Sequence, residues 1–428
     1  MTQRFGTFTR GFISTFTLDI ASRGMGALTT VLLLRALPVD GFAYIVFFLN
    51  IGQFFGSAAT GGLRIRYTRM EAERVSRGVD EPSAFHVTLR NGVILIVAAA
   101  LVSLGGAFAL GIGGSDHERL VFIALGTAFT IGAASIELAI FHYQAQLAFF
   151  RAGRIAVARN GILLVVAALA TVGLVDSGQV VGLYFAIATN LVALFVAAPL
   201  ALETRHTKAT SEGRFGFGRE SAALTLYSLV SSGWAYLDIF LVAALLNSAS
   251  VAAYGAALRY ISIVTGPMPS LVSVLRIRTT QHDMIDSAHA QIELMSRWLR
   301  QTIVPAVVLL VVAAVAAIWV IPIVNGGRYP ESVGVFQVLL VAACAQFVTL
   351  PNSGLLITQE RYTTLAWTNA LVVALNIPLA AVAAPLFGVV GVAAVGSGVG
   401  VFQVALVSYL AAHPPELRDG ETEHVVPG

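Results

Sequence analysis

Apolar stretches long enough to cross a lipid bilayer recur along the whole chain, and they restrict what it can fold into. Of the 428 residues, 57% are hydrophobic and 11% are charged, and the mean hydropathy is +0.81. An ordinary soluble domain has about a quarter of its residues charged. A helix needs about 20 mostly apolar residues to cross the bilayer. The sequence therefore predicts an all-α integral membrane protein.

Twelve segments meet this length criterion. They are residues 11–36, 41–63, 87–112, 119–143, 159–176, 179–202, 221–246, 251–275, 301–324, 332–357, 364–386 and 389–411. Because the number of crossings is even, both ends of the chain should lie on the same side of the membrane.

Basic residues gather in alternate connections, and such connections are typical of the cytoplasmic side. The clusters follow the second, fourth, sixth and eighth segments and include Arg64, Arg66, Arg69, Arg74, Arg77, Arg151, Arg154, Arg159, Arg205, Lys208, Arg214, Arg219, Arg276, Arg278, Arg297 and Arg300. The opposite connections hold only Arg35, Arg119 and Arg328. We therefore expect a multi-pass protein with both termini in the cytoplasm and no room for an external catalytic domain.

A polar stretch at residues 204–220 divides the twelve segments into six and six. We predict a first bundle over 1–203, a cytoplasmic linker over 204–220, a second bundle over 221–411 and a disordered cytoplasmic tail over 412–428. The two halves share a pattern of paired leucines, a short turn and a Gly/Ala and aromatic cluster. Internal similarity of this kind is typical of transporters whose substrate site lies between repeated bundles.

Three stretches resemble the polysaccharide-unit (O-antigen, Wzx-type) flippases. LLLRALPVDGFAYIVFFLNIGQFF is similar to the end of that family's first helix and the start of its second. YLDIFLVAALLNSASVAAYGAALRY resembles the seventh and eighth helices, and NGGRYPESVGVFQVLL resembles the approach to the tenth. The resemblance implies the multidrug/oligosaccharidyl-lipid/polysaccharide exporter (MOP) superfamily. Its fold is two pseudo-symmetric six-helix bundles that form a V and give alternating access to a central cavity.

The same resemblance implies a function. The cargo would be an undecaprenyl-diphosphate-linked oligosaccharide, moved from the inner to the outer leaflet of the bacterial cytoplasmic membrane for lipopolysaccharide or exopolysaccharide biosynthesis. The expected partners are this substrate, the surrounding membrane lipids, and a polysaccharide polymerase and glycosyltransferases, with no nucleic acid. No cofactor is expected beyond a coupling proton or sodium ion.

Two arginines inside predicted spans are candidates for holding a diphosphate, because a guanidinium stays charged and can make bidentate contacts. They are Arg23 in the first span and Arg259 in the eighth, one from each half. The resemblance also favours Arg23, since related lipid flippases carry a Ser-Arg pair there, here Ser22 and Arg23. Alternatively, Arg23 pairs with Asp19 and Arg259 extends to the surface. Arg35 is expected to be an interfacial anchor.

Carboxylates within spans are candidates for ion coupling or for pairing inside the cavity, because charge in the bilayer is costly. These residues are Asp19, Glu137 and Asp238. The alternative is a fixed pair for each, with Arg23 for Asp19 and another basic group for Asp238. Pro267 and Pro269 make the eighth span a candidate hinge, although a static kink is the other interpretation.

Further polar residues in the spans suit either sugar contacts or bonds between helices. They are Asn50, Gln53, Tyr143, Gln144, Asn190, Tyr227, Trp234, Tyr236, Gln346, Asn352, Asn369 and Asn376. No catalytic residues and no metal-binding motif are found, so we expect a protein that is not an enzyme. The alternatives to a flippase are a cation-coupled drug or metabolite antiporter of the same superfamily, and a polysaccharide polymerase or ligase.

Overall fold

The computed structural model describes residues 2–77, 85–109, 116–146, 148–175, 177–205, 219–265, 288–358 and 361–413, and nearly all of them are helical. The first half contains α1 (Thr2–Ala36), α2 (Val39–Arg77), α3 (Phe85–Ala109), α4 (Asp116–Ala145), α5 (Phe149–Thr171) and α6 (Gly178–Arg205). The second contains α7 (Arg219–Leu245), α8 (Ser248–Val264), α11 (Ala288–Asn325), α12 (Glu331–Thr358) and α13 (Tyr362–Ala412). The all-α prediction is confirmed.

A break divides α13 into two arms. Gly388 has φ 60° and ψ −147° inside this helix, a left-handed conformation that glycine adopts without strain. The predicted segments 364–386 and 389–411 are the two arms.

Several helices extend beyond the predicted segments, since α1 begins at Thr2 and α11 at Ala288, and two further differences bear on the site. The second span was expected to end at residue 63, but α2 continues to Arg77, and its apolar part reaches Tyr67. The fifth was expected to begin at residue 159, but α5 begins at Phe149. Arg64 and Arg159 therefore lie inside helices and not in cytoplasmic connections. A hydropathy criterion ends a predicted span at an arginine. The helix itself can continue past that arginine when the side chain is paired with an opposite charge.

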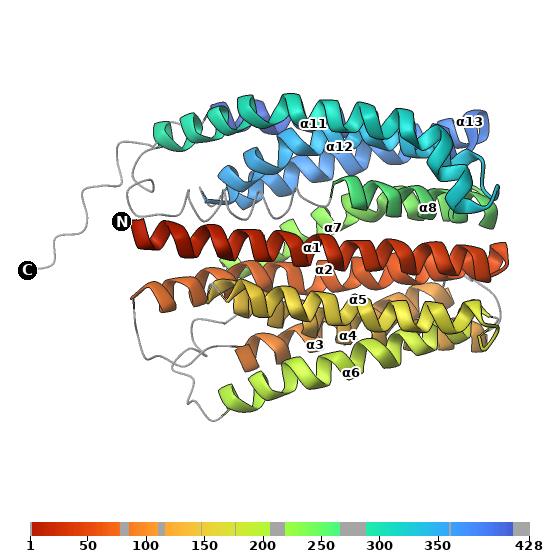
Figure 1. The fold of residues 1–428 in the computed structure, drawn as a ribbon, viewed down its shortest axis with the longest axis horizontal. Coiled ribbons are helices and arrows are strands. Elements are labelled where there is room, and N and C mark those ends of the chain that lie inside the picture. The colour runs from red at the N-terminus through yellow and green to blue at the C-terminus, as the bar shows by residue number, and fades with distance from the viewer. Residues whose placement is uncertain are drawn as a thin grey trace, which may run out of the picture.

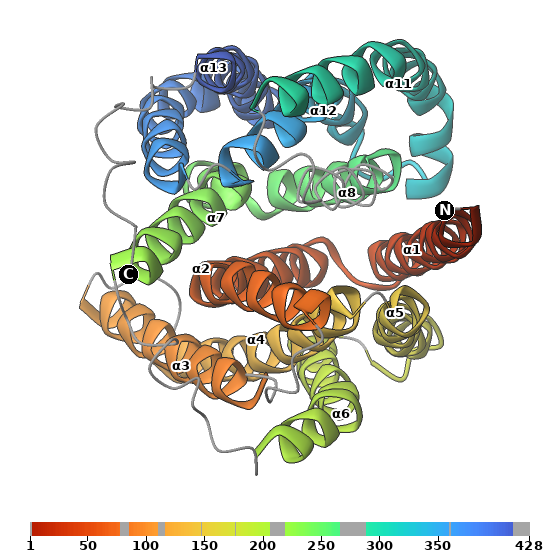
Figure 2. The same ribbon diagram turned by 90° about the vertical axis from the view of Figure 1, so that its left-hand side faces the viewer.

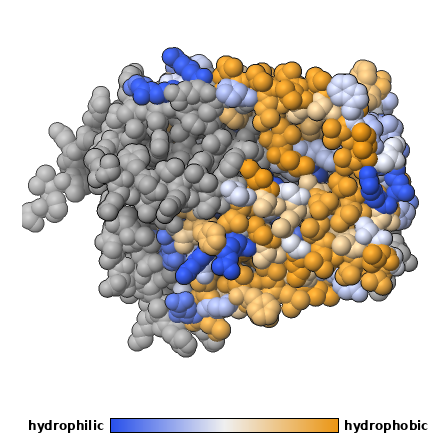
Figure 3. Space-filling model, in the orientation of Figure 1, coloured by the Kyte–Doolittle hydropathy of each residue, from blue (hydrophilic) through white to orange (hydrophobic). Residues whose placement is uncertain are grey.

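Seven helices among the described residues are long and apolar enough to cross a membrane. Their outer faces carry large apolar side chains, which cover much of the surface in Figure 3. Exposed examples on α11 are Val304, Val312, Trp319 and Ile323. Apolar side chains in such a belt are stable against lipid and not against water.

The helices run roughly along one direction, as Figure 1 shows. Viewed end-on in Figure 2, α1 to α6 form one half and α7 to α13 the other. The halves meet where α2 contacts α7 and α8, and where α1 contacts α8 and α11. Residues 206–218 of the predicted linker and 414–428 of the predicted tail lie outside the described residues.

The buried core joins the halves at one end only. The largest cluster combines residues near the α1–α2 junction, such as Leu34 and Phe42, with Val251 of α8 and Val335 of α12. At the opposite end the halves have separate small clusters, one around Tyr67 and Phe85 of the first half and one around Leu355 and Leu365 of the second. The two halves therefore share a core at the α1–α2 end. Toward the other end each has its own core, although α2 and α7 still touch at Gly62 and Leu224.

Candidate functional site

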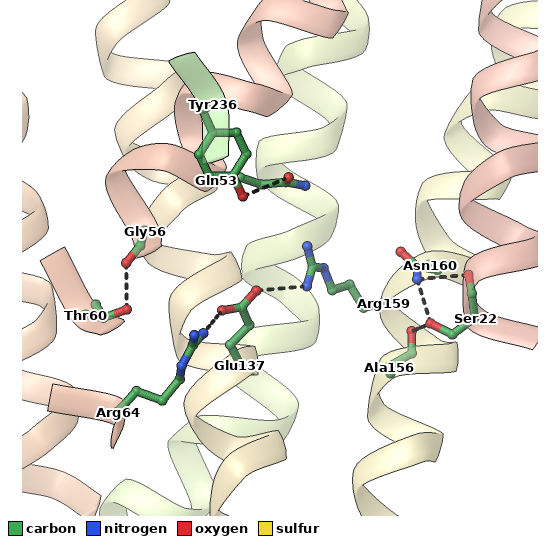
Figure 4. A network of polar contacts seen from close by, with 10 residues as sticks. All are labelled: Ser22, Gln53, Gly56, Thr60, Arg64, Glu137, Ala156, Arg159, Asn160 and Tyr236. Atoms are coloured by element: carbon green, nitrogen blue, oxygen red, sulfur yellow. Dashed lines mark hydrogen bonds and ion pairs between the residues drawn. The ribbon is translucent and has the colours of Figure 1, made fainter. Parts of the chain in front are cut away.

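An ion-pair network of partly exposed side chains joins α2, α4 and α5 of the first half, where the sequence alone predicted only Glu137. Glu137 of α4 accepts a hydrogen bond from Arg64 Nη1 of α2 on its Oε2, at 2.7 Å. Its other oxygen, Oε1, lies 3.7 Å from Nη1 of Arg159 on α5. Figure 4 shows the carboxylate between the two guanidinium groups. One carboxylate thus bridges arginines from two other helices.

Arg159 is the less satisfied of the two arginines. Its side chain is 17% exposed, and its Nε is buried with no hydrogen-bond partner among the described residues. A guanidinium makes its strongest contact when two N–H groups face two oxygens. The 3.7 Å approach to Glu137 is too long for a hydrogen bond, so Arg159 retains capacity for an anionic ligand.

Arg259 of α8 faces this network from the second half. It lies within electrostatic range of Arg159 and of Tyr236 on α7, and Tyr236 in turn interacts electrostatically with Glu137 and Arg64. Across the described part of the chain, no carboxylate lies within 4.0 Å of the Arg259 guanidinium. Two arginines from opposite halves therefore lie within electrostatic range of one another, and of these two only Arg159 has a carboxylate within 4.0 Å among the described residues.

Arg23 follows a residue of α1 that is bonded to α5. This residue, Ser22, accepts a hydrogen bond from Asn160 Nδ2 at 2.6 Å and donates one to the Ala156 carbonyl at 3.1 Å. Figure 4 shows these bonds between α1 and the helix that carries Arg159. Arg23 is partly buried and engaged in interactions of its own. The side chain of Asp19 lies outside the described part, so the predicted Asp19–Arg23 pair stays a prediction.

Polar and aromatic groups on α2 and α7 line the contact between the halves. Tyr236 Oη lies 3.5 Å from Oε1 of Gln53, and Ser228 Oγ donates to the Ser57 carbonyl at 2.7 Å. The Tyr236 ring packs edge-on against Phe54. Gln53 and Tyr236 were among the polar residues expected either to meet sugars or to join helices, and in this structure they join helices across the two halves.

Asp238 forms a second site, inside the second half. Its carboxylate accepts hydrogen bonds from Tyr254 Oη of α8 at 2.9 Å and from Asn376 Nδ2 of α13 at 3.0 Å. The Asn376 side chain is fully buried and its Oδ1 has no hydrogen-bond partner among the described residues. A Cβ at Gly396 would lie 2.2 Å from Oδ2 of Asp238. The basic partner considered for Asp238 is therefore not what the structure shows, since neutral donors surround the carboxylate.

Other predicted residues have different outcomes. Arg35, expected as an interfacial anchor, hydrogen-bonds to the carbonyls of Ile323 and Val324 in the other half, each at 3.0 Å. Pro267 and Pro269, the candidate hinge, lie outside the described residues. No group of three or more His, Cys, Asp or Glu residues that could hold a metal ion occurs in the described ranges.

Sequence reasoning missed Arg64 and Arg159 because both were assigned to loops. One signal could have found them: Glu137 lies deep in an apolar span and requires a basic partner there. Arg159 also directly precedes the apolar run of α5, so a helix starting earlier would place it within the membrane.

No protein-family model matches the sequence, and no curated protein matches it either. Solved structures do match its fold. The lipid II flippase MurJ, in an inward closed conformation, superimposes with a TM-score of 0.72 at 14% identity, covering 95% of this chain and 88% of MurJ. A mutant of the Vibrio cholerae MATE transporter VcmN gives 0.65 at 12% identity, covering 96% and 98%.

An outward-facing multidrug resistance MATE transporter of the MOP superfamily gives a TM-score of 0.65 at 14% identity, with 95% of each chain covered. MurJ is a lipid flippase and the other two are MATE transporters. Together with the apolar helices, the match makes this chain a multi-pass membrane protein. Its fold is the one shared by MATE transporters and the MurJ flippase, with two pseudo-symmetric six-helix bundles as the sequence predicted.

Proposed function

We propose that this protein is a flippase for an undecaprenyl-diphosphate-linked oligosaccharide. It would carry the lipid from the inner to the outer leaflet of the bacterial cytoplasmic membrane by alternating access, and so supply cell-surface polysaccharide biosynthesis. In this proposal the α1–α2 end, meaning the end of the molecule where α1 is connected to α2, faces outward. Both termini are then cytoplasmic, as the distribution of basic residues favours.

The observation that carries the proposal is that Arg159 and Arg259, from opposite halves, lie within electrostatic range of one another. Two like charges close together in a region of low dielectric constant are unfavourable unless an anion joins them. A diphosphate offers several oxygens in the geometry that guanidinium groups prefer. Because the arginines belong to different halves, a bound diphosphate would connect the two halves. A ligand that connects them would make their relative movement depend on cargo.

The core arrangement suits the first step of such a cycle. The halves share a core at the α1–α2 end and have separate cores at the opposite end. If the α1–α2 end is the outer one, the site is closed toward the outside. Entry of the head group from the cytoplasmic side would then require α2 and α7 to separate near Gly62 and Leu224, where the two helices are in close contact.

The decisive experiment is deletion of the gene followed by leaflet-resolved analysis of undecaprenyl-linked glycans. We expect the glycan to accumulate on the cytoplasmic leaflet, and complementation with the wild-type gene to restore its transfer. Complementation with the Arg159→Ala and Arg259→Ala double variant, expressed at the same level, should not. Normal outer-leaflet glycan in the deletion strain would overturn the proposal.

A second candidate function is a cation-coupled drug or metabolite antiporter, and the Asp238 site favours it. A buried carboxylate beside the unpartnered Oδ1 of Asn376 is the kind of oxygen cluster that binds a proton or sodium ion. Changed drug resistance in the deletion strain, with normal outer-leaflet glycan, would favour this function. The same site could also supply the driving ion of a flippase.

A further inference from the structure

Glu137 has two unequal contacts. Its Oε2 is held at 2.7 Å by Arg64, whereas its Oε1 only approaches Arg159, at 3.7 Å. The first contact is a strong charge-assisted hydrogen bond, and the second is electrostatic only. Among the described residues, Glu137 is therefore hydrogen-bonded to Arg64 only. For Arg159 it is a nearby counter-ion without a hydrogen bond.

We infer that Glu137 occupies the place of one cargo phosphate at Arg159, and that binding of the anionic head group displaces it. This inference rests on the proposed function and assigns to Glu137 the role of a residue that sets affinity for the cargo. Without such a counter-ion, the partly buried guanidinium of Arg159 would have no negative charge beside it when no cargo is bound, and this would destabilise the empty protein.

Displacement of Glu137 is favourable because a phosphate can accept hydrogen bonds from Arg159, whereas Glu137 accepts none from it. Two phosphate oxygens can face two N–H groups, including the Nε that has no partner among the described residues. A phosphate there would repel the nearby carboxylate. Glu137 would then rely on the short bond to Arg64, which is already formed.

Glu137 needs only a small movement to leave Arg159, because its contact there is already long, at 3.7 Å. The hollow next to Arg64, among α2, α3 and α4, has a volume of about 20 Å³ and a mostly apolar lining, which is room for about one water molecule. The Arg64–Glu137 pair would therefore stay in place, and only the contact of Oε1 with Arg159 would be given up. When the cargo leaves, the carboxylate returns to Arg159, so Glu137 competes with the cargo and accelerates its release.

The test measures binding of undecaprenyl diphosphate to the purified full-length protein in nanodiscs, together with its dissociation rate. Glu137→Gln keeps the shape of the side chain and removes the competing charge. We expect it to bind the lipid about tenfold more tightly, with slower dissociation. Glu203→Gln is the matched control, because Glu203 is an exposed carboxylate in the same half, and it should leave the affinity unchanged.

Glu137→Asp provides a second variant in case the Gln variant does not fold. It keeps the charge but shortens the side chain, which draws the carboxylate away from one of its two arginines. Because the contact with Arg159 is the longer one, at 3.7 Å, it is the one expected to be lost, and this variant too should bind the lipid more tightly. A folded Glu137→Gln protein that binds as the wild type does, or more weakly, would overturn the inference and leave the proposed function standing. Failure of the wild-type protein to bind undecaprenyl diphosphate would overturn the proposed cargo, and the inference with it.

Discussion

Arg35 and Arg328 each donate hydrogen bonds to backbone carbonyls that lie close to the other arginine in the chain and belong to the opposite half of the protein. Arg35, near the end of α1, donates to the carbonyls of Ile323 and Val324 in the last turn of α11. Arg328, which follows α11, donates to the carbonyls of Leu34 and Leu37 at the end of α1, at 3.3 Å each. The last carbonyls of a helix lack intrahelical partners and carry partial negative charge. Arg35 thus caps the last carbonyls of α11, and Arg328 caps carbonyls at the end of α1.

Further contacts reinforce this junction. Ser248 Oγ, at the start of α8, donates to Asp40 Oδ1 of α2 at 2.5 Å. The Tyr329 ring packs on Phe42 with ring centroids 6.0 Å apart. Tyr329 has a φ of 57°, an uncommon conformation for a residue with a side chain. The α1–α2 end is therefore held closed by specific polar contacts as well as by its core.

Replacing both arginines, Arg35→Ala with Arg328→Ala, should open the α1–α2 end more often. Each lost hydrogen bond contributes about 1 kcal/mol, so the equilibrium should shift about tenfold or more toward the open form. The measurement is labelling of Val251→Cys, a buried position of α8, by a membrane-impermeant maleimide in a Cys344→Ser background. We expect faster labelling in the double variant.

Arg361→Ala is the matched control for this experiment. Arg361 also donates to a helix carbonyl, that of Leu410 at 2.8 Å, but within one half. Its loss should not change the labelling of Val251→Cys. Equal labelling in the wild type and the Arg35/Arg328 variant would show that these bonds do not keep the end closed.

Single replacement of Arg159 or Arg259 should impair transport without unfolding the protein. We expect each alanine variant to lose at least about tenfold in glycan translocation, since a charge-assisted contact to a phosphate contributes about 1.5–3 kcal/mol. Lysine variants should retain part of the activity, because the charge remains while the bidentate geometry is lost. Leaflet-resolved glycan analysis at matched expression measures the alanine and the lysine variants. Full activity of Arg259→Ala would contradict a site formed by arginines from both halves.

Asp238→Asn tests the proposal that Asp238 is an ion-coupling site. The amide is nearly isosteric and its oxygen can still accept from Asn376, whereas its NH2 group would have to donate to Tyr254 Oη instead of accepting from it. We expect unchanged or raised thermal stability, because the variant no longer buries a carboxylate. Transport in proteoliposomes should no longer respond to a sodium or proton gradient, and a preserved response would exclude Asp238 as the coupling site.

Gly62→Ala should destabilise the contact between α2 and α7. A Cβ at Gly62 would lie 2.9 Å from the backbone of Leu224 and Thr225, so the two helices would have to separate. Overpacking of this kind costs about 1–3 kcal/mol, and the midpoint of thermal unfolding in detergent should fall. Gly233→Ala on α7 is the control, since a Cβ there meets no atom within 4 Å. Equal midpoints for the two variants would mean that the close approach is not required.

The sequence by itself determined the membrane-spanning all-α class, the number of apolar segments and the presence of costly charges within them. Those properties follow from composition and from segment length, which are local. Asp238, Glu137 and Arg259 could be singled out because any ionisable residue in an apolar run is conspicuous.

Only the tertiary structure decided which of those charges meet. The Glu137 contacts join residues 73 and 22 positions away, on helices whose neighbours no local pattern specifies. Arg64 and Arg159 were misplaced because hydropathy cannot tell an arginine that ends a span from one that is compensated inside it. The capping exchange of Arg35 and Arg328 was likewise invisible, since it depends on two helix ends brought together by the packing of the two halves.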